Sequence, residues 1–263
     1  MFSLSSLQEY FRFKASQHHE VISSPPFIFF FHTADSSEDA NYALPDAAES
    51  SDLQESLARL QTIFTERDRK PCLQFIEEGF PHLAPVLRSS GWSQQERSQV
   101  MICTSETYQT APDISGLAIF TLSHESRVEE ICEGLDTNAL GFDPQAERAT
   151  NHEAEEFRQD LILSRAFVAR LHDHPVAAGM FTDIHEGLTE LVGITTLEPF
   201  RRRGIAAALT AFMTQRAFQE GATLVFLIAA NEQAGRIYER VGFRPRATQV
   251  IYELSPSTSD EQE

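Results

Sequence analysis

Three consecutive arginines, Arg201 to Arg203, stand directly before Gly204 and a stretch whose apolar residues recur with the period of a helix. The first amides of a helix have no partners within it and carry the positive end of its dipole, so a helix start favours anions. Gly204 and the small Ala206 would let a bulky anion approach the backbone closely. The arginines add charged donors. Residues 201–207 are therefore predicted to hold phosphate, and a diphosphate is the natural ligand.

Two other interpretations of this turn stay open on its residues alone. A basic helix start can simply face solvent. A phosphate loop of a nucleotide-binding fold is a poorer match, because the turn has no G-x-G-x-x-G and no Lys-Ser/Thr pair follows Gly204.

A second pattern follows downstream: Asn231-x-x-Ala234-x-x-x-Tyr238-x-x-x-Gly242-Phe243. Asn231 can cap a helix and Gly242 can end it. Between the two patterns lie a helix predicted at 205–220 and an apolar run at 223–230, which is typical of a strand buried on both faces. The two patterns are thus separated by one helix and one central strand.

Together the two patterns resemble the GNAT N-acetyltransferase superfamily. Residues 196–206 match its acyl-CoA motif, with the core Arg/Gln-x-x-Gly-x-Gly/Ala, and the Asn231 to Phe243 pattern matches its second element. The resemblance covers roughly residues 113–254. It implies an α/β (α+β) fold of the GNAT acyl-CoA N-acyltransferase type, a mixed and mostly antiparallel sheet flanked by helices. It also implies acetyl-CoA as cosubstrate.

The resemblance implies which residues contact that cosubstrate. Backbone groups of residues 194–196 would pair with the pantetheine arm as an added strand does, and the amides of residues 202–207 would surround the pyrophosphate. Asn231 would contact the cofactor farther along, although a simple N-cap role explains it equally well. The implied cofactor-binding residues are Ile194, Thr195, Thr196, Arg201, Arg202, Arg203, Gly204, Ile205, Ala206, Ala207 and Asn231.

Two residues are candidates for catalysis on the same resemblance. Tyr238 would protonate the departing thiolate, with a core aromatic on a helix face as the alternative. Glu190 matches the catalytic glutamate of the histone-acetyltransferase branch, and it would accept the proton of the amine directly or through water. A solvent-facing strand residue is the alternative for Glu190. Another branch has its glutamate where this chain has Phe226, and His185 and Glu186 are weaker candidates.

The implied activity is transfer of an acetyl group to a primary amine by direct attack in a ternary complex. A non-catalytic CoA-binding regulatory module and a transferase for a longer acyl group are the alternatives. The acceptor is expected to be a small-molecule or peptide amine, and the acidic chain favours a cationic one. A monomer or a homodimer is expected.

Composition limits the other classes of protein. The formal net charge of -18 argues against nucleic-acid binding, and no apolar run approaches the ~18 residues of a membrane span. The N-terminus has no signal-peptide pattern, so a cytoplasmic location is expected. Cys72, Cys103 and Cys132 lie far apart and predict buried thiols. His172-x-His174 offers only two ligands in a hairpin turn, so no metal is expected.

Several further elements must position these residues. Apolar patterns predict strands at 27–31, 71–76, 99–104, 116–122, 166–171, 176–184, 189–196 and 248–254, and helices at 52–67 and 79–90. Ser126 with Glu129, and Thr150 with Glu153, have the spacing of capping boxes that begin two more helices. Residues 34–56 are acidic and are expected to form a solvated loop.

The two halves of the chain resemble each other. Each has a helix, a buried strand, a short helix, a Gly-aromatic pair (Gly91-Trp92 and Gly242-Phe243) and a strand containing Gln-Val. The first half has no counterpart of the 201–207 turn, and Leu87 aligns with Tyr238. We therefore expect a degenerate GNAT-like domain at 1–110, a catalytic domain at 111–254 and a disordered acidic tail at 255–263.

Overall fold

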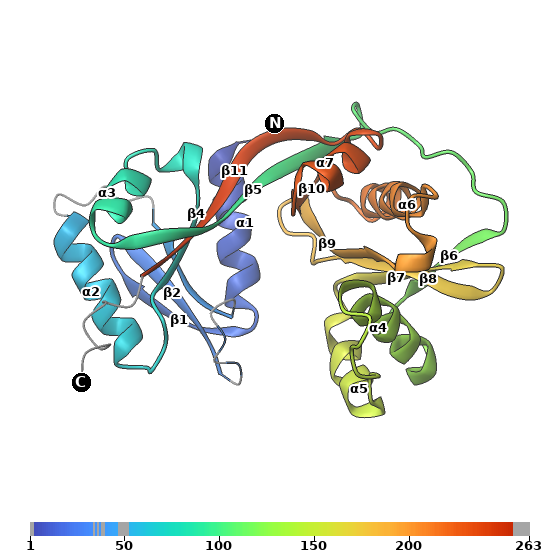
Figure 1. Ribbon diagram of the computed structural model, residues 1–263, viewed down its shortest axis with the longest axis horizontal. Helices are drawn as coiled ribbons and strands as arrows, with labels where there is room; N and C mark the ends of the chain where they lie inside the picture. Colours follow the sequence, from blue (N-terminus) through green and yellow to red (C-terminus); the bar gives the residue numbers. More distant parts are fainter. Residues whose placement is uncertain (1–2, 34, 36, 38–39, 47–52, 255–263) are drawn as a thin grey trace. The chain divides into compact units, whose positions relative to one another are not determined.

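The computed structural model describes residues 3–33, 35, 37, 40–46 and 53–254 (Figure 1). The chain divides into two compact units, one made of Met1–Gln99 with Ala247–Glu263 and one made of Val100–Arg246. The expected tail at 255–263 lies outside the described residues. Within the described part of the chain, no helix has the length and apolar character that crossing a membrane requires.

The first unit is built on a sheet with the strand order β1-β2-β3-β4-β11-β5. β1, β2 and β3 are antiparallel neighbours, and β3 runs parallel to β4. The elements of this unit are α1 (Leu4–Ser16), β1 (His19–Ser24), β2 (Phe27–His32), β3 (Asn41–Pro45), α2 (Leu53–Thr65), β4 (Cys72–Ile76), the 3-10 turn Glu77–Gly79, α3 (Leu83–Ser89), β5 (Trp92–Thr104) and β11 (Arg244–Leu254).

The expected loop at 34–56 is wrong for residues 41–45. This segment forms the strand β3 because β2 on one side and β4 on the other provide its hydrogen-bonding partners. Asn41 and Ala43 of this strand are fully buried. Phe29 and Phe31 of the neighbouring β2 pack with Phe64 of α2 in the core of this unit. The remaining residues of the expected loop lie partly outside the described ranges.

The second unit is built on a sheet with the strand order β5-β10-β9-β8-β7-β6. Its strands β6 to β9 are antiparallel neighbours, and β9 runs parallel to β10. The elements of this unit are β6 (Leu117–Leu122), α4 (Val128–Phe142), α5 (Asn151–Asp160), β7 (Arg165–Leu171), β8 (His174–Phe181), β9 (Leu188–Thr196), the 3-10 turn Glu198–Phe200, α6 (Ile205–Gln219), β10 (Leu224–Ala229) and α7 (Glu232–Glu239).

Helices cover both faces of this second sheet (Figure 1). α4 and α5 pack through Ile131 and Ala154 on one face, against Leu122 and Val168. α6 packs on the other face in a larger apolar cluster that includes Phe167. The fold is therefore α/β with a mixed sheet between helices, as predicted.

Helix starts were predicted with mixed success. Thr150 and Glu153 form the expected capping box of α5. The box expected at Ser126 and Glu129 is wrong by one residue, because Glu130 accepts from the Arg127 amide while the Ser126 hydroxyl accepts from a turn amide.

The two halves repeat one order of elements and exchange their last strands. Three strands, a helix, a strand, a helix and a long final strand follow in each half. The final strand of the first half, β5, enters the second unit from Val100, and the final strand of the second half, β11, enters the first unit from Ala247. The units therefore differ from the expected single boundary after residue 110.

Candidate active site

β9 parts from its neighbour β10 a third of the way along its length. The two strands pair through only three residues, ending at Glu190 opposite Phe226, while β9 continues to Thr196. On its other edge β9 bulges, because two residues, Gly193 and Ile194, lie opposite one residue of β8. Gly193 adopts a φ of 63°, which suits only glycine at low energy. The part of β9 after Glu190 thus has an edge that β10 does not occupy.

The turn after β9 leads into α6 with an unusual row of free amides. Gly204 caps the helix with a φ of 82°, and Arg202 adopts a φ of 62°. The Ala208 amide is the first to bond within the helix, to the Gly204 carbonyl at 3.0 Å. The six amides from Arg202 to Ala207 have no acceptor among the described residues. Six free donors at the positive end of a helix form a strong anion site.

One cleft of about 950 Å³ connects these two features. It is lined by the free part of β9, the turn, the end of α4 and one face of α7. The described residues that line it include four arginines and no Asp or Glu. The lining residues used below are Gly141, Ile194, Thr195, Thr196, Arg201, Arg202, Gly204, Ile205, Ala206, Ala207, Arg236, Tyr238 and Arg240. A chain with a net charge of -18 thus has a cleft of positive sign.

The three arginines of the turn have different partners. Arg201 donates from Nε to the Thr196 carbonyl at 3.0 Å and from Nη2 to the Gly141 carbonyl at 2.9 Å, so it braces the turn against β9 and α4. Arg203 donates to the Pro199 carbonyl at 3.1 Å, lies over the Phe200 ring and does not line the cleft. Arg202 lines the cleft and is exposed.

Two threonines at the end of β9, Thr195 and Thr196, form part of the cleft wall. Thr195 packs against Gly141, where a Cβ would lie 2.1 Å from the Thr195 Oγ1. Thr196 is only 8% exposed, and its Oγ1 has no hydrogen-bond partner among the described residues. A buried hydroxyl without a partner is destabilising, so a ligand that bonds to it here would be favoured.

Tyr238 places a phenol in the cleft. Its ring contacts the Phe243 ring edge-on with centroids 6.3 Å apart, and burial raises the pKa of its hydroxyl. None of the described residues bonds to that hydroxyl. Tyr238 therefore keeps its proton at neutral pH and can give it to a group that enters the cleft.

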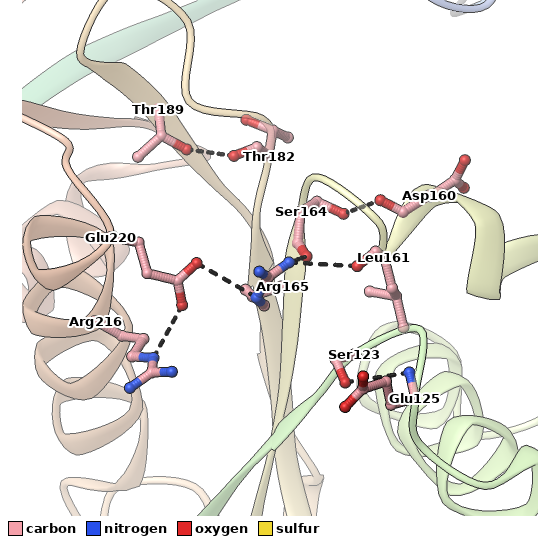
Figure 2. Close-up of polar contacts among 10 residues, drawn as sticks. All are labelled: Ser123, Glu125, Asp160, Leu161, Ser164, Arg165, Thr182, Thr189, Arg216 and Glu220. Atoms are coloured by element: carbon pink, nitrogen blue, oxygen red, sulfur yellow. Dashed lines mark hydrogen bonds and ion pairs between the residues drawn. The ribbon is translucent and has the colours of Figure 1, made fainter.

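Glu190 is buried, so its interpretation as a solvent-facing residue is wrong. It is 3% exposed, and it lies where β9 and β10 part. Its backbone is fixed by Thr182, whose amide donates to the Glu190 carbonyl and whose hydroxyl accepts from the Glu190 amide. Thr189 adds a bond to the Thr182 carbonyl at 2.6 Å (Figure 2). Glu190 itself does not line the cleft.

The remaining predicted residues lie outside the cleft. Asn231 caps α7, with its Oδ1 accepting from the Ala234 amide at 3.0 Å, and does not line the cleft. His185 and Glu186 form the turn between β8 and β9.

Cys72 and Cys103 are buried as predicted, and burial raises the pKa of the Cys103 thiol. Cys132 is half-buried, which corrects the expectation of three buried thiols.

The far end of α6 is anchored to the sheet (Figure 2). Glu220 forms ion pairs with Arg216 at 2.9 Å and with Arg165 at 3.3 Å. Arg165 also donates to the carbonyls of Leu161 and Ser164 at the end of α5. This network joins the C-terminal end of α6 to the start of β7. The free amides lie at the opposite, N-terminal end of the same helix.

The corresponding region of the first unit is filled. β3 and β4 pair at one position and then part, as β9 and β10 part after three, but α1 side chains occupy the gap. Arg12 donates to the Pro45 carbonyl at 3.1 Å and pairs with Asp46, and the remaining space is about 10 Å³. Leu87, which aligns with Tyr238, is fully buried.

Comparison with known proteins agrees with this geometry. Residues 130–243 match the model of the Acetyltransferase (GNAT) family. A GCN5-related N-acetyltransferase from Kribbella flavida is similar over 98% of each chain, with a TM-score of 0.80 and 24% identity. Another from Sphaerobacter thermophilus is similar over 88% of this chain and 78% of its own, with a TM-score of 0.63 and 17% identity.

A tandem GNAT protein from the clavulanic acid biosynthesis pathway is similar over 97% of this chain and 95% of its own, with a TM-score of 0.62 and 12% identity. No curated protein sequence matches the chain. At these identities the solved structures establish the fold, and the family match identifies the domain. The second unit is a domain of the GNAT acetyltransferase superfamily, as predicted.

Proposed function

We propose that the protein is an acetyl-CoA-dependent N-acetyltransferase that acts on a primary amine. The observation that carries the proposal is the composition of one cleft: free helix amides, four arginines with no Asp or Glu among the described lining residues, an unpaired strand edge and a half-buried phenol. Each of these fits one part of an acyl-CoA molecule.

The cleft residues fit the cosubstrate from its phosphates to its thioester. The amides of residues 202–207 would surround the pyrophosphate, and Arg202, Arg236 and Arg240 would add charge from the two sides of the cleft. The free edge of β9 at residues 194–196 would pair with the pantetheine amides as a strand does. Thr196 Oγ1 would gain the partner that it lacks within the described residues.

In the proposed reaction, the neutral amine nitrogen attacks the thioester carbonyl carbon directly. A backbone N–H at the β9 bulge would polarise the carbonyl as negative charge develops on its oxygen. The carbon–sulfur bond breaks, and Tyr238 gives its proton to the departing sulfur. Glu190 takes the extra proton of the amine through water, because its side chain is buried outside the cleft. No cysteine among the described lining residues is placed to form an intermediate.

The substitution Tyr238→Phe tests the proposal. It should lower kcat by about 10²- to 10⁴-fold, the usual contribution of a positioned acid, and leave the Kd of acetyl-CoA unchanged. Tyr108→Phe is the matched control: it removes a bond to the Ala211 carbonyl outside the cleft and should leave kcat unchanged.

A mass-spectrometric screen of amines with acetyl-CoA supplies the acceptor for these assays. If no amine is modified while acetyl-CoA binds, the protein is a CoA-binding module and the transferase proposal fails. If longer acyl-CoA esters bind more tightly than acetyl-CoA, the protein transfers a longer acyl group and the proposal of an acetyl group is wrong.

A further inference from the structure

α4 lies close to the sheet because one face of the helix is lined by small or polar residues. Gly134, Asn138 and Gly141 are spaced so that they share this face. A Cβ at Gly134 would lie 2.6 Å from a Leu122 methyl carbon, and one at Gly141 would overlap Thr195. α4 is thus fixed across the sheet, against β6 at Gly134 and against β9 at Gly141, and Asn138 lies between the two glycine contacts.

Asn138 contacts the bulge of β9 directly. Its Nδ2 donates to the Gly193 carbonyl at 2.5 Å, which is short for a neutral amide bond. A Cβ at Gly193 would lie 3.1 Å from the same Nδ2, so the two residues fit closely. This bond comes from outside the sheet, at a residue whose neighbours along β9 have no partner in β10.

The bond has a consequence for the next amide. A trans peptide unit is planar, and its C=O and N–H point in opposite directions. Because the Gly193 carbonyl accepts from Asn138 on α4, the Ile194 N–H points away from α4, toward the opposite face of the sheet, which α6 covers (Figure 1). Ile194 is one of the residues that line the cleft. Fixing the Gly193 carbonyl therefore fixes the direction of the N–H of a residue that lines the cleft.

We propose that Asn138 is a positioning residue, which holds the peptide plane between Gly193 and Ile194 so that the Ile194 N–H polarises the thioester carbonyl. This inference rests on the proposed function, since it concerns the same cleft and the same cosubstrate. No pattern in the sequence marks Asn138, because its role depends on how α4 packs on β9.

Two substitutions test it. Asn138→Ala removes the donor, and Asn138→Asp keeps the shape but places a carboxylate against the Gly193 carbonyl. Gln145→Glu is the control, because it makes the same change from amide to carboxylate at an exposed residue just after α4. Each variant is compared with the wild type by thermal melting, so that loss of the fold is recognised.

The first readout needs no acceptor. Acetyl-CoA labelled with ¹³C at its carbonyl is bound to the protein, and the carbonyl stretch is recorded by infrared difference spectroscopy. The wild type should shift the band to lower frequency. Asn138→Ala should lose most of the shift and Asn138→Asp all of it, at saturating acetyl-CoA, while Gln145→Glu should keep it.

The second readout is turnover with the acceptor found by the screen. Asn138→Ala should lower kcat by about 10- to 100-fold with less than about a twofold change in the Kd of acetyl-CoA, since misplacing one donor affects the transition state most. An unchanged band and unchanged kcat in folded Asn138→Ala overturn the inference and leave the proposed function standing. Failure of the wild type to bind acetyl-CoA overturns both.

Discussion

The three arginines of the 201–203 segment should respond differently to substitution by alanine. Arg202 lines the cleft, and a hydrogen bond to a charged partner contributes about 1.5–3 kcal/mol to the free energy of binding. Because the side chain is exposed, we expect the lower end of that range. Arg202→Ala should therefore weaken CoA binding by about tenfold and leave the melting temperature unchanged.

Arg201→Ala should change both quantities. The side chain donates to the carbonyls of Thr196 and Gly141, and two such bonds contribute about 2 kcal/mol together. For a chain of this size that loss lowers the melting temperature by about 4–8 °C. CoA binding should weaken as well, because the turn loses its brace to β9.

Arg203→Ala is the internal control. Its guanidinium is engaged with the Pro199 carbonyl and the Phe200 ring and does not line the cleft, so the Kd of CoA should stay within about twofold. Calorimetric titration with CoA and thermal melting of the three variants measure these effects. Equal weakening by Arg202→Ala and Arg203→Ala would refute the assignment, and so would an Arg201→Ala variant as stable as the wild type.

Three further predictions concern packing, the thiols and pH. Gly141→Ala forces a Cβ against Thr195 and should destabilise the fold by about 1–3 kcal/mol, measured by urea unfolding; an unchanged midpoint contradicts this packing. Cys72 and Cys103 should resist iodoacetamide near neutral pH in the folded protein and react in urea, as mass spectrometry would show; rapid labelling of both without urea would disprove their burial. The acid form of Tyr238 is the active one and burial raises its pKa, so kcat should not fall with rising pH below the usual tyrosine value of about 10; an earlier alkaline loss that Tyr238→Phe abolishes would be inconsistent with this.

Local patterns predicted most of the second unit. The strand before Arg201, the helix after Gly204 and the cap at Asn231 depend on residues close in sequence, and the structure has each of them. The capping box at Thr150 was predicted for the same reason. Such signals fix where elements begin and which side chains face the core.

Pairing between distant segments was not predictable in this way. β3 has five residues within an acidic stretch, and only its neighbours β2 and β4 make it a strand. α1 and β1 were not predicted at all. The exchange of β5 and β11 between the units depends on the whole sheet, which no local pattern encodes.

The candidate site shows the same division. The sequence indicated residues 201–207 as an anion site, but it did not distinguish the bracing Arg201 from the cleft-lining Arg202, since that depends on where the Gly141 carbonyl lies. The burial of Glu190 and the contact of Asn138 with Gly193 are likewise tertiary facts. Side-chain roles in a turn follow from the packing around it rather than from residue type.

Calorimetric titration of the whole chain with CoA is the most direct test of the cleft as the cosubstrate site. The second unit has the free amides and the positive cleft, while Arg12 and its neighbours fill the corresponding region of the first. We predict one CoA bound per chain, with an affinity that falls as salt is raised, because arginines and helix amides hold its phosphates. Absence of binding, or two equivalent sites per chain, would contradict the account.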